Sequence, residues 1–389
     1  MRNAERGLFE LRRGRALLVR EDGAGAGHVL VASVEGLAEA GLRALEEMAD
    51  SPPRLVLTRH RAAAMGLVPA SEDRDPGDPA PPAGQGHRSV TLCLARGASL
   101  STVLRLSTGR AGPWADPPPS ACPQLPAEDA GLRLAHLGQL LPALVAAPVG
   151  PAPTPALRDA LSSGAVLAVD RSEIQAFVRA SKSDVVRVSD APVPLSEAEN
   201  SRFILYREAC GLGEHVAILV GSEEAWPDPL PVRFHSACLT GDLFGSLRCD
   251  CGEQLRGSME YFASRGGGVL LYLAQEGRGI GLGNKFRAYT LQETGLDTID
   301  ADGTLGFGAD ERRYDVAVKI LQELGIRRIE LLTNNPEKVA AVEAAGVEVV
   351  RRRPLHGQLN RHNLPYVRAK VDRAGHWLHG MLRQGAAGD

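Results

Sequence analysis

The sequence predicts two α/β domains, of which the C-terminal one contains a mixed sheet. With 389 residues the chain exceeds the length of one ordinary domain. Hydrophobic residues make up 44% and charged residues 23%, a balance typical of a folded globular protein. From about residue 184, strand-like apolar runs alternate with amphipathic helices. This alternation predicts a mixed or parallel sheet with ligand sites at its strand-to-helix turns.

The first 150 residues are expected to form a separate α/β domain with long loops. Hydrophobic periodicity predicts a helix over 4–13, strands over 15–19 and 28–34, a strong helix over 35–50 and a strand over 53–58. Proline-rich stretches at 71–86 and 112–127 predict surface loops, because proline removes a backbone donor and fixes φ.

A third proline-rich stretch, APVGPAPTP around residue 150, is typical of a linker. We therefore expect residues 151–185 to connect the two domains. Within this segment the pattern predicts a helix, a strand and a helix, and it leaves open which domain they join.

The C-terminal domain is expected to span 186–389. Strands are predicted over 215–221, 232–239, 268–275 and 326–333, and helices over 252–266, 284–295, 311–325 and 336–346. In the third of these helices Ala317, Ile320 and Leu324 share one face, and Gly325 provides the stop.

Composition argues against several classes of partner. The net charge of −3 and the 4% aromatic content give neither a basic field nor stacking platforms, so nucleic acid is not expected. No apolar run approaches the ~20 residues that cross a bilayer, and the N-terminus lacks a secretory core. A cytoplasmic location without membrane association follows, and in a reducing compartment cysteines are expected as ligands or thiols rather than disulfides.

A cluster of cysteines is the strongest chemical signal. Cys238, Cys249 and Cys251 lie within HSACLTGDLFGSLRCDCG. Thiolates bind zinc well, and two of them one residue apart on a turn can reach the same ion as a third from a neighbouring strand. Three protein ligands leave the fourth tetrahedral position for water, which is typical of catalytic zinc.

Two other interpretations of this cluster stay open. The three cysteines could be buried thiols that serve only as small apolar side chains. Alternatively, His235 or Cys210 could close the site as a fourth ligand and make it structural. Cys93 and Cys122 lie elsewhere in the sequence and are expected to be inert.

A glycine-rich turn follows the predicted strand 268–275. GRGIGLGNK alternates glycine with other residues, so that backbone amides and the next helix N-terminus can approach an anion, and Arg278 and Lys285 add charge. The alternative is a turn in which glycine serves only to reverse the chain.

Two further turns carry polar residues. In LLTNNPEKV, Pro336 suits the first position of a helix, and Lys338 in its first turn would be favoured by an anionic ligand. In GFGADERRYD, Asp310, Glu311 and Arg312 precede a helix. Taken singly, an ordinary surface lysine and a capped helix explain these turns equally well.

Together these segments closely resemble GTP cyclohydrolase II, the zinc enzyme that begins riboflavin synthesis. The resemblance runs from about Val186 to His376 and includes RFHSACLTGDLFGSLRCDCGEQL, LAQEGRGIGLGNKFRAY, LGFGADER and LLTNNPEKV in that order. It implies that the three cysteines hold one Zn²⁺ per subunit with an open position, so the C-terminal domain is expected to be a zinc-containing catalytic domain.

The resemblance also implies roles for individual residues. Asp310 matches the family's proton acceptor, Arg312 its proposed nucleophile towards the α-phosphorus, and Tyr289 a catalytic tyrosine. For Arg312, stabilisation of transition-state charge is the physically simpler role. The implied GTP contacts are Arg233, Phe234, His235, Ser236, Ala237, Gln254, Glu276, Gly277, Arg278, Thr298, Thr333 and Lys338.

The implied reaction combines two chemistries. Pyrophosphate leaves from the triphosphate while Mg²⁺ neutralises its charge, and water activated by zinc opens the imidazole ring with release of formate. The family's product is a diaminopyrimidinone ribosylamine 5′-phosphate, and its members are commonly homodimers. A cyclohydrolase for another purine nucleotide, or a zinc-stabilised nucleotide sensor, are the alternative functions.

The chain departs from the family pattern at two places. Ala237 stands where the family usually has Glu, and PVPLSEAENSRFILYREACG replaces a T-P-x-G-x-F pattern. The N-terminal half, through FELRRGRALLVREDG, resembles 3,4-dihydroxy-2-butanone 4-phosphate synthase. Its loop REDGAGAGHVLVA lacks the acidic residues that hold Mg²⁺ in that synthase, so this domain is expected to be a degenerate, non-catalytic relative.

Overall fold

The computed structural model describes residues 2–23, 27–68, 89–109, 120–181, 184–373, 375 and 377–378. The chain divides into two compact units. Unit 1 contains residues 1–180 together with 286–296 and 300–310, and unit 2 contains 181–285, 297–299 and 311–389. The expectation of α/β architecture with a mixed C-terminal sheet is confirmed by the strand pairing in both units.

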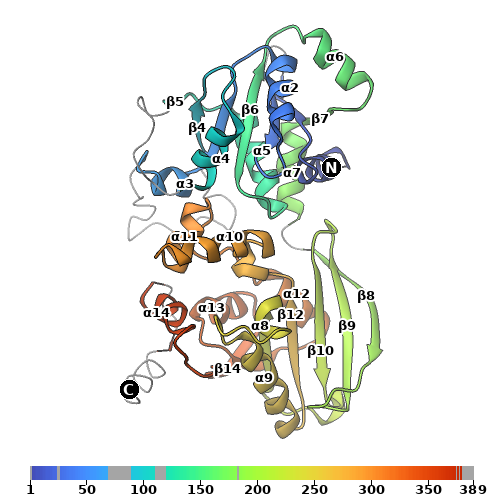
Figure 1. The fold of residues 1–389 in the computed structure, drawn as a ribbon. Helices are drawn as coiled ribbons and strands as arrows, with labels where there is room; N and C mark the ends of the chain where they lie inside the picture. Colours follow the sequence, from blue (N-terminus) through green and yellow to red (C-terminus); the bar gives the residue numbers. More distant parts are fainter. Residues whose placement is uncertain are drawn as a thin grey trace. The chain divides into compact units, whose positions relative to one another are not determined.

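Unit 1 contains a sheet of strand order β5-β4-β3-β6-β2-β1-β7. Figure 1 labels four of these strands, β4, β5, β6 and β7. The strands of unit 1 are β1 (Leu17–Arg20), β2 (His28–Ser33), β3 (Arg54–Thr58), β4 (Ser89–Cys93), β5 (Ala121–Cys122), β6 (Ala143–Val149) and β7 (Leu167–Asp170). Its helices are α1 (Arg2–Arg12), α2 (Glu39–Ala49), α3 (Arg59–Ala64), α4 (Leu100–Thr108), α5 (Pro126–Leu137), α6 (Pro155–Ser162) and α7 (Arg171–Ala180).

The core of unit 1 lies on both faces of its central strands. Strands β2 and β6 are buried along most of their length, and both α5 and α2 pack on them. Leu42 and Leu45 of α2 are buried at helical spacing, as are Leu8 and Leu11 of α1. The amphipathic periodicity in the sequence therefore marks the faces that pack.

Residues 151–180 belong to unit 1, and residues 181–185 belong to unit 2. The former carry α6, β7 and α7, and β7 pairs in parallel with β1, from Leu17 opposite Leu167 to Arg20 opposite Asp170. The predicted helix–strand–helix pattern is thus confirmed. The expected connection is thus built of regular elements up to Ala180, and Thr154 caps the first of them, α6.

The proline-rich stretch 112–127 is only in part a loop. Where the structure describes it, the strand β5 pairs with β4, and α5 begins at Pro126. Proline suits the first turn of a helix, because the N–H it lacks would have no intrahelical acceptor. The other predicted loop, 71–86, lies outside the described residues.

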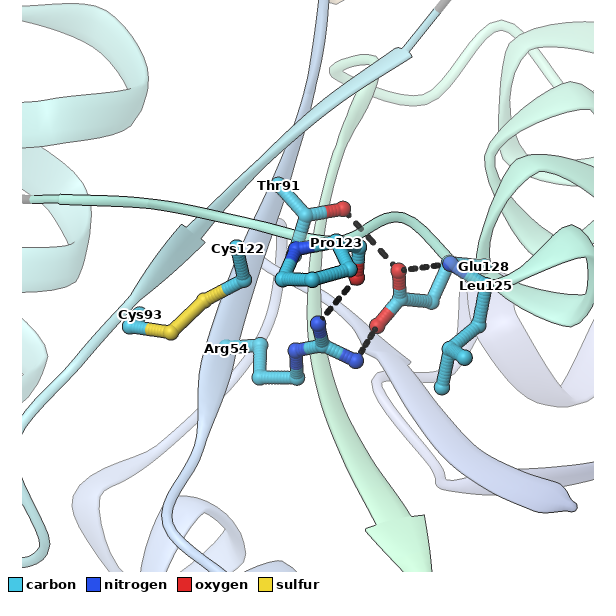
Figure 2. Close-up of a disulfide and its surroundings, with 7 residues drawn as sticks. All are labelled: Arg54, Thr91, Cys93, Cys122, Pro123, Leu125 and Glu128. Carbon is cyan, nitrogen blue, oxygen red and sulfur yellow. Dashed lines mark hydrogen bonds and ion pairs between the residues drawn. A yellow bond between two sulfur atoms is a disulfide. The ribbon is translucent and has the colours of Figure 1, made fainter.

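A disulfide between Cys93 and Cys122 corrects the expectation of two inert thiols. It joins the ends of β4 and β5, whose pairing sets Thr91 opposite Cys122, with a Cα–Cα distance of 5.6 Å (Figure 2). That separation is normal for a bridge. Sequence alone gave no sign of it because β5 is only two residues long and lies in a proline-rich stretch.

Unit 2 contains a sheet of order β14-β13-β11-β12-β10-β9-β8. Its strands are β8 (Val185–Pro192), β9 (Ser201–Glu208), β10 (Glu214–Val220), β11 (Leu230–Ser236), β12 (Gly268–Leu273), β13 (Arg328–Leu332) and β14 (Glu348–Arg353). Its helices are α8 (Leu239–Asp242), α9 (Cys251–Arg265), α12 (Asp315–Glu323), α13 (Pro336–Ala344) and α14 (Leu364–Asp372), with short turns η1 (Glu223–Ala225) and η2 (Glu276–Gly279).

Parallel and antiparallel pairing divide this sheet. Strands β12, β11, β13 and β14 run parallel, whereas β8, β9 and β10 form an antiparallel meander. Residues of one face, including Phe234 and Leu271, pack with Ile320 of α12. Leu270 and Leu332 on the other face pack with Phe262 of α9. Burial on both faces explains why β12, whose sequence is GVLLYL, is almost entirely apolar.

Two helices link the units along the chain. Helix α10 (Leu282–Glu293) starts in unit 2 and continues in unit 1 from Phe286, and most of α11 (Thr298–Thr304) also belongs to unit 1. Within the described residues, no helix combines the length and the apolar character that crossing a membrane requires.

Candidate functional site

Three parallel strands of unit 2 end side by side. Register places Ser236 of β11 opposite Leu273 of β12, and Val232 of β11 opposite Leu331 of β13. Most of the sequence-predicted site residues lie at the end of β11 or in the turns and helix starts that follow these strands. The carboxyl ends of parallel strands are the usual place for a ligand site in α/β sheets.

The three predicted cysteines come together at this edge. Cys238 follows β11, and Cys251 begins α9. The sulfur atoms of Cys238, Cys249 and Cys251 all lie within 4.8 Å of one another, and those of Cys238 and Cys249 are 3.7 Å apart. Tetrahedral zinc with Zn–S bonds of ~2.3 Å would place two sulfurs about 3.8 Å apart. The cluster therefore fits a zinc ion.

Gly241 forms the wall of this cluster. A Cβ atom at this position would lie 2.7 Å from the sulfur of Cys249 and 3.1 Å from that of Cys238. The glycine of the CLTGD motif thus leaves room for three sulfurs to converge. A side chain here would occupy the space that the ligands need.

The electrostatics of the cluster favour a bound cation. Thiol hydrogen bonds from Cys249 and Cys251, with the nearby charge of Lys285, lower the pKa of Cys238 strongly. The same proximity to Cys238 raises the pKa of Cys249 to about 11, and it also raises the pKa of Cys251. Without a cation, the first thiolate to form thus opposes ionisation of the other two.

Lys285 supplies a positive charge beside the sulfurs. Its Nζ lies 3.3 Å from the sulfur of Cys238, 3.0 Å from Oγ1 of Thr240 and 2.8 Å from Oε1 of Glu276. Sequence analysis placed this lysine near a phosphate-binding turn. The structure instead shows that its ammonium group contacts a predicted metal ligand.

Asp242 organises the loop around Cys238 and was missed by sequence analysis. Its carboxylate accepts hydrogen bonds from Cys238 N at 2.9 Å and Tyr272 OH at 2.9 Å, and lies 3.0 and 3.1 Å from Nε2 of His235. The only available signal was its place in the motif CLTGD, which looks like an ordinary turn.

Neither alternative fourth ligand belongs to the cluster. Among the described residues, the candidate metal-binding group contains the three cysteines alone. Nε2 of His235 faces Asp242, and the sulfur of Cys210 lies 3.2 Å from a carboxylate oxygen of Glu208. The arrangement thus agrees with a site of three protein ligands.

The two ring nitrogens of His235 differ in their surroundings. Burial lowers the pKa of this histidine, so the ring is neutral near pH 7. Because Nε2 faces a carboxylate, it carries the proton, and Nδ1 keeps a lone pair. Nδ1 is buried and has no hydrogen-bond partner among the residues that the structure describes.

Other buried polar atoms around the strand ends share this property. Buried polar groups are normally hydrogen-bonded, so a set of unsatisfied ones marks a place where a ligand or water binds. The atoms are Nε of Arg233, Nδ1 of His235, Oγ of Ser236, Oε1 of Gln275 and Oδ1 of Asn334.

The predicted GTP contacts from Arg233 to Ala237 lie on β11 and directly after it, where successive side chains point to opposite faces of the sheet. Arg233 is buried, and its guanidinium donates to Leu332 O at 2.8 Å and to Oε1 of Gln254, while burial lowers its pKa to about 10. The side chain of Phe234 instead lies in the hydrophobic core, which leaves only its backbone for polar contacts. Ala237 N donates to Leu273 O.

The glycine-rich turn adopts an unusual backbone. Gly277 and Arg278 have φ values of 62° and 63°, and a non-glycine residue in this left-handed region is costly. Glu276 fixes the turn to the cysteine loop, because its carboxylate accepts from Leu239 N at 2.7 Å and from Gly277 N at 2.9 Å. Glu276 is therefore occupied by protein groups.

Arg312 lies in a segment that this turn holds. Glu311 N donates to Arg278 O at 3.1 Å, and Nε2 of Gln275 donates to Arg313 O. A Cβ at Gly279 would lie 2.8 Å from backbone atoms of Glu311, so only glycine allows this approach. The geometry thus brings the backbone of Glu311 and Arg312 against the glycine-rich turn.

The β13–α13 turn is held by its own side chains. Oγ1 of Thr333 accepts from Asn335 N at 3.0 Å, and Oδ1 of Asn335 caps α13 by accepting from Glu337 N at 2.8 Å. Lys338 is buried, and its Nζ donates to Phe234 O at 2.7 Å and lies 5.5 Å from the ring centre of Tyr314. Lys338 is thus not a surface lysine.

The remaining predicted residues are divided between the units. Thr298 belongs to unit 2, whereas Tyr289 on α10 and Asp310 belong to unit 1. Their roles rest on the resemblance described above.

Comparison with known proteins shows the family to which the chain belongs. The sequence profile of the family GTP cyclohydrolase II matches residues 186–354. GTP cyclohydrolase-2 of Azospirillum brasilense is 39% identical over 380 residues, covering 97% of this chain and 94% of its own length. Riboflavin biosynthesis protein RibBA of Bacillus subtilis is 51% identical over 166 residues, covering 43% of this chain and 42% of its own length.

Among solved structures, RibBX of A. baumannii, a two-domain 3,4-dihydroxy-2-butanone 4-phosphate synthase, covers 90% of this chain and 98% of its own. Its TM-score is 0.33 and its identity 15%. The Azospirillum relative, in contrast, matches both units at an identity that establishes common descent. The chain is therefore an enzyme of the GTP cyclohydrolase II family.

Proposed function

We propose that the chain hydrolyses GTP with release of formate and pyrophosphate, forming 2,5-diamino-6-ribosylamino-4(3H)-pyrimidinone 5′-phosphate as the first step of riboflavin biosynthesis. The observation that carries this proposal is the convergence of three cysteine sulfurs at the carboxyl end of β11, beside unsatisfied buried polar atoms. A soluble, cytoplasmic homodimer with Mg²⁺ on the triphosphate completes the proposal.

Cys238, Cys249 and Cys251 would hold one Zn²⁺. When bound, the ion supplies a nucleophilic oxygen from water near neutral pH. Gly241 leaves the space for the sulfurs, and Lys285 offsets part of their negative charge. Because Asp242 fixes both Cys238 N and the ring of His235, the metal ligand and the recognition residue are positioned by one carboxylate.

GTP would be bound by the strand ends and their turns. Nδ1 of His235 is an acceptor for an N–H or O–H of the nucleotide, and the buried Arg233 offers its unsatisfied Nε as a donor. Arg278 and Arg312 are the cations for the triphosphate, since guanidinium matches phosphate geometry. Gln254, Thr298, Thr333 and Lys338 are carried as contacts from the family resemblance.

Asp310 is proposed as the proton acceptor, and Tyr289 as a catalytic tyrosine. For Arg312 we favour stabilisation of the charge that develops on the α-phosphate as pyrophosphate leaves. Ring opening and phosphate cleavage would thus use different residues. Mutations can therefore separate the two products.

The test is turnover of GTP by zinc- and magnesium-loaded protein, following formate and pyrophosphate together. Wild-type protein should release both, and Cys249→Ser should lose formate release by at least a hundredfold. Cys210→Ser is the matched control, because this buried cysteine lies outside the cluster. Formate release that survives Cys249→Ser contradicts the proposal, and faster turnover of ATP or ITP than of GTP assigns the enzyme to another purine nucleotide.

A further inference from the structure

The motif LGFGADER, at residues 305–312, is divided between two environments. Its apolar half packs inside unit 1, where Leu305 and Phe307 are each only 1% exposed. Phe307 packs edge-on against the ring of His136, with ring centres 5.5 Å apart. Its polar half carries Asp310. The burial of the first half is therefore a feature that the proposed chemistry does not explain.

Thr58, at the end of β3, binds this segment directly. Its Oγ1 donates to Gly306 O at 2.7 Å and accepts from Arg61 N at 3.2 Å, so one hydroxyl both caps α3 and anchors the segment. Gly306 has φ +92°, and a Cβ there would lie 2.8 Å from Oγ1 of Thr58 and 3.1 Å from Pro142. Glycine is thus required at the contact.

Arg61 completes the anchor. Its side chain is buried, and its guanidinium donates to backbone oxygens of Thr304 at 3.0 Å, Leu106 at 2.9 Å and Gly109 at 2.7 Å. Burial lowers the pKa of Arg61 to about 10, which still leaves it charged at neutral pH. The rigid, planar guanidinium group of Arg61 on α3 therefore hydrogen-bonds both to α4 and its C-cap and to the end of α11.

A second and weaker contact joins the neighbouring helix α10 to Glu35. Nη1 of Arg287 on α10 lies 3.2 Å from Oε2 of Glu35, and both side chains are about one-third exposed. Solvent screens such a pair, and its contribution is small. The buried contacts of Thr58 and Arg61 are therefore the main anchor for residues 304–307.

We propose that Thr58 and Arg61 are positioning residues for GTP hydrolysis, and that the first 180 residues serve the reaction as a scaffold for Asp310. This inference rests on the proposed function, in which Asp310 accepts a proton. Only Gly308 and Ala309 separate Phe307 from Asp310, so fixing residues 304–307 restricts where its carboxylate can lie. Misplacement by ~1 Å can cost a hundredfold in rate.

Four variants test the proposal. Thr58→Val keeps the size of the side chain and removes its hydrogen bonds, whereas Thr58→Ser keeps the hydroxyl. Arg61→Lys keeps the positive charge and removes the planar guanidinium group with its several N–H donors. Glu128→Gln is the control: Glu128 is buried in the same unit, where it binds Arg54, Thr91 and Leu125 and not the segment 304–307 (Figure 2).

Steady-state kinetics with GTP should show a split between kcat and KM. Thr58→Val and Arg61→Lys should lower kcat about tenfold or more and leave KM within twofold, because the proposed GTP contacts on β11 lie in unit 2. Thr58→Ser should restore kcat. Glu128→Gln should keep wild-type kcat even if its melting temperature falls as far as that of Thr58→Val. Equal kcat in Thr58→Val and wild type, or an equal loss in Glu128→Gln, overturns the proposal.

Hydrogen exchange supplies a readout that does not depend on turnover. Amides of residues 300–310 should exchange at least tenfold faster in Thr58→Val than in Thr58→Ser, and no faster in Glu128→Gln than in wild type. Wild-type protein that releases no formate would refute the proposed function alone. Unchanged exchange in Thr58→Val would refute the anchoring role, whatever the activity.

Discussion

A single ammonium group, that of Lys285, stands between the metal-ligand loop and the glycine-rich turn. It contacts the sulfur of Cys238 and the carboxylate of Glu276, and Glu276 in turn accepts from Leu239 N. Three thiolates with Zn²⁺ carry a net charge of −1, so a neighbouring cation lowers the cost of assembling the cluster.

We expect Lys285→Met to weaken zinc binding by about ten- to a hundredfold, as loss of outer contacts does at other zinc sites. Competition with a chromogenic chelator measures the dissociation constant. Lys319→Met is the control, because Lys319 pairs with Asp184 at an exposed site. Equal zinc affinity in Lys285→Met and wild type would show that the ammonium group has no part in holding the metal.

The close packing around Gly241 predicts that a side chain at this position disrupts the cysteine cluster. In Gly241→Ala the new methyl group would overlap the sulfur of Cys249 at 2.7 Å, so the cluster must open. Zinc content, measured by atomic emission, should fall well below one ion per chain, and formate release should fall at least tenfold. Gly257→Ala is the control, since its nearest contact is Leu355 at 3.9 Å. A full zinc complement in Gly241→Ala would count against the three-sulfur site.

At the scale of elements, the turn η2 combines strain with charge. Arg278 has φ 63°, and its carbonyl accepts from Glu311 N. Strained residues cost about 1–3 kcal/mol and persist where the surroundings hold them, often at functional sites. The chain tolerates this cost at the place where phosphate binding is proposed.

Two substitutions separate the strain from the charge. Arg278→Ala and Arg278→Gly both remove the guanidinium, but only glycine relieves the left-handed backbone. We expect Arg278→Gly to exceed Arg278→Ala by about 1 kcal/mol in free energy of unfolding, measured with urea. Both variants should show a raised KM for GTP. If alanine is as stable as glycine, the turn does not keep this conformation in solution.

The proposed site is built from residues at the ends of several strands of unit 2. The metal ligands come from the end of β11 and the start of α9, whereas the proposed recognition groups come from β11 and the turns after β12 and β13. Parallel strands bring these turns to one edge even though they are separated by up to a hundred residues. The strand–helix alternation in the sequence was therefore enough to predict that ligand-binding residues gather at the carboxyl edge of this sheet.

At the scale of the whole molecule, the disulfide Cys93–Cys122 lies in unit 1, and its effect is expected on the stability of that unit. It closes a loop with a sequence separation of 29, and by chain entropy such a crosslink stabilises a fold by about 3–4 kcal/mol. We expect Cys93→Ser/Cys122→Ser to lower the stability of unit 1 by up to this amount. Formate release should change less than twofold at temperatures where the unit stays folded.

Urea unfolding followed by circular dichroism measures this effect. Wild-type protein treated with a reductant is the matched control and should behave as the double variant does. Intact mass under non-reducing conditions should show two hydrogens fewer than the fully reduced chain. Two additional free thiols in untreated protein would contradict the bridge.

The sequence alone determined the features that depend on neighbours in the chain. Helical and strand periodicity predicted α9, α12, α13 and the central strands of unit 2, since a face that packs must repeat every 3.6 or 2 residues. The type and spacing of the three cysteines likewise predicted that their sulfurs converge, which the structure confirms, whereas zinc binding stays a prediction. The exposed strand β8 was not predicted because little of it is buried, and burial is what produces an apolar pattern.

Only the tertiary structure decided which distant residues meet. The placement of 151–180 and 300–310 in unit 1, the contact of Lys285 with a sulfur, and the hydrogen bonds of Asp242 and Arg61 all join segments without a shared local pattern. Burial of one face of a helix or strand produces a periodic apolar pattern in the sequence. Which residue a buried side chain contacts produces no such pattern. Long-range hydrogen bonds are therefore fixed by packing, and a linear pattern does not record them.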